Sequence, residues 1–226
     1  FVWGVSMKTL VIAPHPDDEA LGCGGTLLRR KAEGIELAWL IVTGISEKTG
    51  WSTEMVRQRD DEIDKVVELI GFGRVFNLRL PSTKLDQLPF SELVNHFSAT
   101  FKTFQPEEIL VPHRSDVHTD HQLVFDATAS CTKWFRYPFV KRVLAYETIS
   151  ETEFCLDPNQ SFKPNYFVDI SDFLERKLEV LAVYQSELGP FPFPRSIEAI
   201  QALATLRGAN SGFMAAEAFQ LLRERQ

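Results

Sequence analysis

Short apolar runs alternate with longer segments of helical period along most of the chain. Continuous apolar runs are typical of strands buried on both faces, and apolar residues at every third or fourth position are typical of helices that cover them. We predict strands over Thr9–Ala13, Leu37–Thr43, Arg74–Asn77, Glu108–Pro112 and Arg142–Glu147. We predict helices between them over Asp17–Ala32, Thr53–Ile70, Ser91–Phe104 and Thr119–Phe135. This alternation predicts an α/β fold with a doubly wound, mostly parallel sheet, Rossmann-like and in one domain.

The last third of the chain predicts one more short strand and then helices. A strand-like segment covers Tyr166–Ile170, a helix begins near Ser171, and helical stretches lie around Ile197–Leu206 and Gly212–Arg223. The run Gly189–Pro194 alternates proline with other residues and cannot be helical. It predicts a stiff apolar loop that packs on the core, lines a pocket or contacts another subunit. Because of the last alternative, the protein could form a homo-oligomer.

Charge and hydropathy exclude several classes of partner. The 226 residues carry a net charge of -7, so there is no electrostatic reason to expect a nucleic acid or an anionic membrane. No run reaches the roughly 18 consecutive apolar residues that predict a membrane span. A small-molecule substrate is therefore expected.

The cysteines indicate the cellular compartment of the protein, and the first residues indicate where its domain begins. Cys23, Cys131 and Cys155 are widely spaced, so at least one stays unpaired, which favours a reducing cytoplasm. Residues 1–6 precede Met7 and lack the features of a signal peptide. We expect them to be a remnant of cloning, and we expect residues 7–226 to form the domain.

Two loops that follow predicted strands hold most of the polar chemistry. Ligands of open α/β sheets bind beyond the carboxyl ends of the strands. Pro14–Glu19 follows the first strand, His113–His121 follows the fourth, and together they hold four of the five histidines. At the first helix start, His15 and Asp18 are three residues apart and share a face, whereas Asp17 is rotated away.

The second loop concentrates two imidazoles and a carboxylate at another helix start. Thr119 and Gln122 have capping-box spacing, which makes Thr119 the expected N-cap and places His121 in the first turn. His118 and Asp120 lie beside it. Two histidines and one carboxylate suit Zn²⁺ or another late divalent metal such as Fe²⁺, used for hydrolysis. A free carboxylate can take a proton from water, and a second histidine can stabilise the oxyanion or protonate the leaving amine.

These motifs resemble those of the LmbE-like or PIG-L-like family of metal-dependent N-acetylglucosaminyl deacetylases. The likeness rests on Ala13–Glu19, on His118–His121 and on Gly22–Thr26, and it extends to Arg59 with Glu62 and to Val168–Ser171 followed by Lys177. A weaker match covers Tyr184–Glu187, where many members carry a glutamine at the position of Glu187.

The resemblance implies an enzyme and a role for each matching residue. It implies that His15, Asp18 and His121 bind the metal, that Asp17 is the general base and that His118 assists the tetrahedral intermediate. Asp120 would then fix the orientation of a histidine, and Arg59 would contact a substrate hydroxyl or phosphate. The expected reaction is zinc-dependent removal of the N-acetyl group from an N-acetylglucosamine-like sugar or glucosaminyl conjugate.

Two alternatives stay open at this point. One is an amidase for a larger N-acyl group. The other is a nucleotide- or sugar-binding Rossmann-like protein without hydrolase activity, since Gly22–Gly25 resembles a dinucleotide fingerprint. Those glycines lie inside the predicted helix and not at its start, so close packing of the helix on the sheet is the favoured interpretation.

Overall fold

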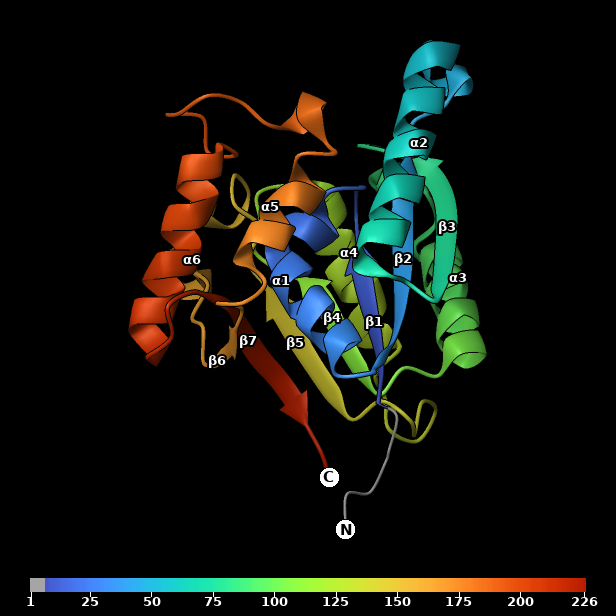
Figure 1. Ribbon diagram of the computed structural model, residues 1–226. Helices are drawn as coiled ribbons and strands as arrows, with labels where there is room; N and C mark the ends of the chain where they lie inside the picture. The colour runs from blue at the N-terminus through green and yellow to red at the C-terminus, as the bar shows by residue number, and fades with distance from the viewer. Residues whose placement is uncertain (1–6) are drawn as a thin grey trace.

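A computed structural model describes residues 7–226 and contains a seven-stranded sheet in the order β3-β2-β1-β4-β5-β7-β6 (Figure 1). The parallel strands are β1 (Lys8–Ala13), β2 (Glu36–Gly44), β3 (Arg74–Pro81), β4 (Glu108–Pro112) and β5 (Arg142–Tyr146). β7 (Ala216–Glu224) pairs antiparallel with β5 and with β6 (Tyr166–Asp169). The expected α/β class with a mostly parallel sheet is confirmed. The expectation for residues 1–6 lies outside the described residues.

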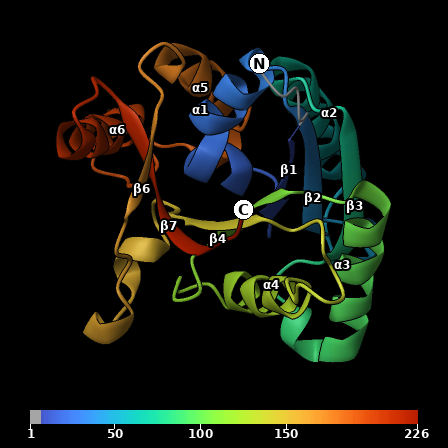
Figure 2. The same cartoon turned by 90° about the horizontal axis from the view of Figure 1, so that it is seen from below.

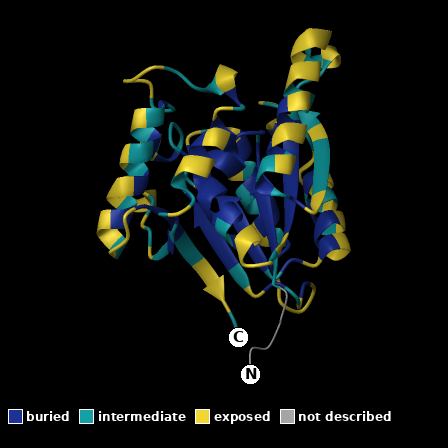
Figure 3. Cartoon of the chain, viewed as in Figure 1, coloured by how far each residue is buried: buried dark blue, intermediate teal, exposed yellow. Residues whose placement is uncertain are grey.

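Helices cover both faces of this sheet, as Figure 2 shows along the strands. One layer contains α1 (Asp18–Ala32), α2 (Thr53–Ile70), α5 (Leu174–Leu181) and α6 (Ile197–Ser211), and the other contains α3 (Phe90–Phe104) and α4 (Thr119–Ser130). Alternate residues of β1 serve the two layers, because successive side chains of a strand point to opposite faces. Val11 packs with the α1 layer and Leu10 with the α3 layer. The central strands are therefore buried along most of their length (Figure 3).

The strand order places a topological switch between β1 and β4. From β1 the chain proceeds to β2 and β3 on one side, and from β4 it proceeds to β5 on the other. The loops beyond the carboxyl ends of β1 and β4 therefore diverge and leave a crevice, which is the usual binding position in such sheets. Both loops that carry the predicted chemistry border this crevice.

The glycines of α1 allow the close packing that the sequence predicts. A Cβ atom at Gly22 would lie 2.2 Å from the ring of Tyr146 in β5, and one at Gly25 would lie 2.8 Å from Ile170. No side chain fits at such distances. Close packing therefore accounts for these glycines without a role in dinucleotide binding.

One predicted helix is wrong. Residues 216–224 form the strand β7, whereas the sequence predicted a helix over Gly212–Arg223. Its alanine, leucine and glutamate residues are good helix formers, but ladders with β5 and β6 on both sides override this local preference. Gly212, with φ 81°, ends α6 in the left-handed conformation and reverses the chain toward the strand. The predicted helix Thr119–Phe135 ends earlier, at Ser130.

The first helix is interrupted at Cys23, where φ is -148° and ψ is 20°. The break exposes amide groups, and the buried carboxylate of Glu217 from β7 accepts hydrogen bonds from the nitrogens of Gly25 (2.9 Å) and Thr26 (2.7 Å). Lys177 of α5 lies 2.7 Å from the same carboxylate. A buried ion pair therefore joins the two parts of α1 to the C-terminal half of the chain.

Within residues 7–226, none of the helices combines the length and the apolar character needed to cross a lipid bilayer.

Candidate metal centre and catalytic site

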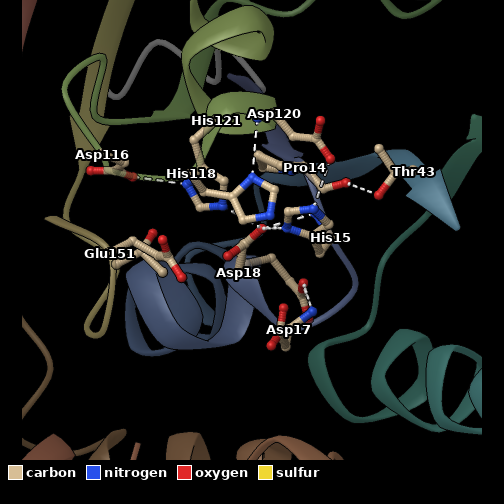
Figure 4. A network of polar contacts seen from close by, with 12 residues as sticks. Pro14, His15, Asp17, Asp18, Thr43, Asp116, His118, Asp120, His121 and Glu151 are labelled. Carbon is tan, nitrogen blue, oxygen red and sulfur yellow. Dashed lines mark hydrogen bonds and ion pairs between the residues drawn. The ribbon is translucent and has the colours of Figure 1, made fainter. Parts of the chain in front are cut away.

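Two imidazoles converge on one carboxylate oxygen at the switch between β1 and β4 (Figure 4). Asp18 Oδ2 lies 3.3 Å from His15 Nδ1 and 3.3 Å from His121 Nε2. One ligand atom from each of these residues can be chosen so that all three atoms lie within 4.8 Å of one another. The side chains of Asp18 and His121 are each 1% exposed, whereas that of His15 is 20% exposed. The arrangement can hold a metal ion that stays accessible from one side.

Local hydrogen bonds hold the first loop in place. The amide of His15 donates to Asp18 Oδ2 at 2.8 Å. The carbonyl of Pro14 accepts from both the amide (2.9 Å) and the hydroxyl (2.8 Å) of Thr43, at the end of β2. Asp17 has φ 142°, a conformation that L-residues rarely adopt and that clusters at functional sites. The strain turns Asp17 away from Asp18 and toward the cavity described below.

Each histidine of this trio also contacts a second carboxylate. His121 Nδ1 lies 2.8 Å from Asp116 Oδ2, and His15 Nε2 lies 3.1 Å from Asp120 Oδ2. Asp116 Oδ1 in turn accepts from the hydroxyl of Thr152 at 2.7 Å. Metal-binding histidines typically donate their other ring nitrogen to a carboxylate in this way. The contact of Asp120 with a histidine is the one that the family resemblance implied, whereas Asp116 was not singled out.

The charges of the trio are strongly coupled. Burial lowers the pKa of both His15 and His121, but neighbouring carboxylates outweigh it. Asp120 and Asp18 raise the pKa of His15 to about 9, and Asp18 and Asp116 raise that of His121 to about 10. Burial acts to raise the pKa of Asp18, yet His121 and His15 hold it well below its usual range. The centre therefore strongly favours positive charge between its carboxylates, which a proton or a metal cation can supply.

Asp17 is another buried carboxylate of the first loop. Its Oδ2 accepts from Arg195 Nη1 at 2.8 Å, and the residue is 4% exposed. Burial and the charge of Asp18 raise the pKa of Asp17 to about 7, against the opposing effect of Arg195. Arg195 lies far along the sequence in the loop before α6, and no local pattern pointed to it.

His118 is the N-cap of α4, so the prediction of Thr119 as the N-cap is wrong. The N-cap is His118 and not Thr119, because His118 Nδ1 accepts from the amide of Asp120 at 3.1 Å. The capping box does not form, since Gln122 instead donates from Nε2 to the carbonyl of Asp116 at 2.8 Å. An acceptor role for Nδ1 places the proton of a neutral imidazole on Nε2. His118 therefore keeps one free N–H donor.

The surroundings also keep His118 neutral. Burial, followed by the charges of His15 and His121, lowers the pKa of His118 to about 4. The ring centroids of His118 and His15 are 4.5 Å apart. A donor from an uncharged imidazole thus lies next to the possible metal centre.

A cavity of about 450 Å³ opens beside these residues. His15, Asp17 and His118 line it, together with Arg59, whose Nη1 donates to the carbonyl of Pro16 at 3.1 Å. In Figure 1, α2 and the orange segment before α6 rise above the sheet on either side. Asp18 and His121 lie beneath the lining, within the protein.

Residues of the β2–α2 connection, of α2 and of the segment before α6 build the remaining walls. Ile45, Trp51 and Met55 form an apolar side, while Glu187 and Arg195 lie among the polar residues. Phe90 and His113 are not part of the lining that the structure describes. His113 is buried and packs edge-on against Phe162, with ring centroids 5.3 Å apart. Its environment is that of a structural histidine.

Comparison with known proteins decides the family. The family model described as PIG-L, GlcNAc-PI de-N-acetylase, matches residues 10–132, which is more than half of the chain. The chain belongs to the PIG-L family. This family match includes both loops of the site, so the resemblance seen in the sequence is confirmed.

Relatives of this PIG-L family protein include known deacetylases. The diacetylchitobiose deacetylase of Thermococcus kodakarensis is 26% identical over 236 residues, which cover 95% of this chain and 83% of that protein. The solved structure of the conserved protein TT1542 from Thermus thermophilus has a TM-score of 0.77 and 27% identity, and covers 97% of this chain and 96% of that one. Homology therefore supports an amide hydrolase.

The fold alone does not fix the reaction. GalB, the 4-carboxy-2-hydroxymuconate hydratase of Pseudomonas putida, has a TM-score of 0.75 with 18% identity, and covers 97% of this chain and 98% of its own. Its similarity shows a shared fold only. Function must be argued from the side chains of the site.

Proposed function

We propose that this protein is a metal-dependent N-deacetylase that removes the acetyl group from an N-acetylglucosamine-like sugar or glucosaminyl conjugate. The observation that carries the proposal is the buried carboxylate of Asp18 between two imidazoles, at the base of a cavity lined by a second carboxylate and a neutral histidine. Nucleotide binding without hydrolysis would require neither this group of metal-binding side chains nor the second carboxylate.

The proposed ligands are His15, Asp18 and His121. Two imidazoles and a carboxylate suit zinc, or Fe²⁺, with a position left open for substrate or water. The contacts of Asp116 and Asp120 with the histidines support this assignment, because they orient the rings and increase their basicity. When bound, zinc would act as a Lewis acid toward the amide carbonyl and would make water more acidic.

Asp17 is the proposed general base. Its carboxylate lines the cavity and is held at Oδ2 by Arg195, which leaves Oδ1 to accept a proton from the attacking water. The same group can deliver that proton to the nitrogen that leaves as an amine. Amide hydrolysis needs this second transfer, because an amide anion is a very poor leaving group.

His118 is proposed to stabilise the developing oxyanion. Its Nδ1 accepts from the Asp120 amide, so the N–H at Nε2 is free to donate to the carbonyl oxygen as charge builds there. Of the two roles considered from the sequence, this contact favours oxyanion stabilisation over protonation of the amine. Trp51 and Met55 offer an apolar surface for one face of a sugar ring.

The test combines elemental analysis with acetate release from N-acetylglucosaminyl compounds, with and without a chelator. We expect about one divalent metal per chain and acetate release that a chelator abolishes and zinc restores. Metal without acetate release, but with release of a longer acyl group from the same sugar, would replace the acetyl assignment. Neither metal nor release after reconstitution with zinc would overturn the proposal.

A further inference from the structure

The charged lining of the cavity has an excess of carboxylates. Four carboxylates and two guanidinium groups line it, belonging to Asp17, Glu62, Glu151 and Glu187, and to Arg59 and Arg195. Within the described part of the chain, no lysine is among the lining residues. Counting carboxylates and guanidinium groups alone, the lining carries two more negative than positive formal charges, and at this wall of the cavity an anionic ligand would need an arginine that is free to receive it.

Arg59 is not free. Its Nη2 lies 2.5 Å from Glu187 Oε1, and its Nε lies 3.3 Å from Glu62 Oε2. Its Nη1 donates to the carbonyl of Pro16. The guanidinium group is thus engaged on three sides, and its charge is opposed by two carboxylates.

Arg195 is engaged in the same way. Its Nη1 lies 2.8 Å from Asp17 and 3.5 Å from Glu187, its Nη2 lies 3.4 Å from Glu151, and its Nε donates to the hydroxyl of Ser150 at 2.7 Å. Glu187 contacts both arginines and, within residues 7–226, is the one carboxylate shared between them.

We infer that the cavity selects amides of uncharged saccharides, and that Glu187 is the residue that excludes anionic aglycones by occupying both arginines. The inference rests on the proposed deacetylase function and adds the charge class of the substrate. A phosphate or carboxylate near Arg59 would have to displace Glu187 and would still face its charge. Repulsion between the Glu187 carboxylate and an anionic ligand would lower the affinity for that ligand and leave the affinity for a neutral sugar unchanged.

The experiment compares two sugars that differ in charge at one position, methyl N-acetyl-α-glucosaminide and N-acetyl-α-glucosamine 1-phosphate. Their kcat/KM values are measured with the zinc-loaded wild-type protein and with Glu187→Gln, which keeps the shape and removes the charge. Asp60→Asn is the matched control, because Asp60 is adjacent to Arg59 in α2, pairs with Arg79 at 2.8 Å and is outside the lining. Calorimetric binding of both sugars repeats the comparison without turnover.

In the wild type we expect the neutral sugar to be preferred by about tenfold or more, and added salt to reduce the preference. Glu187→Gln should lower the ratio at least fivefold, while Asp60→Asn should leave it within twofold of the wild-type value. Equal or better use of the phosphate sugar by the wild type would overturn the inference, as would an unchanged ratio in Glu187→Gln. If neither sugar released acetate, the proposed function would be in question, and calorimetric binding of the two sugars would then decide the charge preference.

Discussion

The carboxylate of Asp17 differs from its neighbour Asp18 in what it contacts, although the two are adjacent in the sequence. Asp18 is enclosed by two imidazoles, whereas Asp17 contacts Arg195 and lines the cavity. We expect Asp17→Asn to retain about one metal per chain and to lose acetate release by about 10²- to 10⁴-fold, because an amide accepts no proton at neutral pH. Elemental analysis and steady-state kinetics measure both quantities.

Asp64→Asn is the control for this variant, since Asp64 is an exposed carboxylate of α2 outside the lining. It should behave as the wild type. If Asp17→Asn lost its metal together with its activity, Asp17 would be a ligand and not the base. If it kept its activity, another group would have to remove the proton.

Asp116 supports a second residue-level prediction. It contacts His121 Nδ1 at 2.8 Å and is fully buried. Because such partners orient the ligand, Asp116→Asn should weaken zinc binding by about 10- to 100-fold. Competition with a chromogenic chelator measures the affinity. Asp126 belongs to the exposed ion pair with Arg114, so Asp126→Asn should leave the zinc affinity unchanged. An equal loss of affinity in both variants would mean that Asp116 has no specific role in zinc binding.

The residues near the possible metal could be predicted because they occupy two short loops beside helix starts. His15 and Asp18 are three residues apart, and His118 precedes His121 by three, so each pair is close along the chain at a helix start. The turn at Asp17, with φ 142°, is not helical, and the sequence did not predict it. Arg195 could not be predicted in this way. It reaches Asp17 across 178 positions of sequence, and only the folded chain brings the two side chains together.

At the scale of elements, α1 is two helical segments joined at Cys23, and Lys177 and Glu217 bridge the joint. Lys177 Nζ donates to the carbonyl of Leu21 at 2.8 Å, before the break, and Glu217 receives amides after it. Both side chains are about 95% buried. Removal of one charge would leave the other unpaired inside the protein.

We expect Glu217→Gln to lower the free energy of unfolding by about 3–5 kcal/mol, the usual cost of breaking a buried ion pair. Urea denaturation measures this change. Replacement of both residues, as in Lys177→Met with Glu217→Leu, should cost less than the sum of the single variants, because neither charge then remains buried alone. Additive effects would mean that the two side chains stabilise the break independently.

The same strand explains the main error of sequence reasoning about elements. The residues of β7 favour a helix locally, and only the edges of β5 and β6 give them ladder partners. The parallel core, in contrast, was predicted correctly because its strands are continuous apolar runs bounded by amphipathic helices. Local patterns therefore identified the five parallel strands and the short strand β6, and missed β7, which is a strand because of its pairing with β5 and β6.

At the scale of the whole molecule, the two halves of the chain contribute different parts of the site. The proposed ligands and the proposed base lie within residues 10–132, the span of the family match. Glu151, Glu187 and Arg195, which complete the charged wall of the cavity, all come from later segments. The early half thus carries the proposed chemistry, and the later half supplies these three charged residues of the lining.

The packing of both halves also determines the chemistry of the three thiols. Cys23 and Cys131 are 0% exposed, one in each of the two core layers, whereas Cys155 is partly exposed in the connection between β5 and β6. Burial raises the pKa of the Cys23 thiol well above its usual range and also raises that of Cys131. Because the thiolate is the reactive form, both should be inert in the folded protein.

We expect one thiol per chain to react rapidly with Ellman's reagent in the native state, and all three to react in guanidinium chloride. The two slow thiols can react only when their layers open, so at neutral pH their rates should be lower by about 10³-fold or more, in line with the opening free energy of a domain core. Cys155→Ser is the control and should abolish the fast phase without changing the slow one. Two or three fast thiols in the native protein would show that at least one core layer opens readily, and the closed packing described for the sheet would then be wrong.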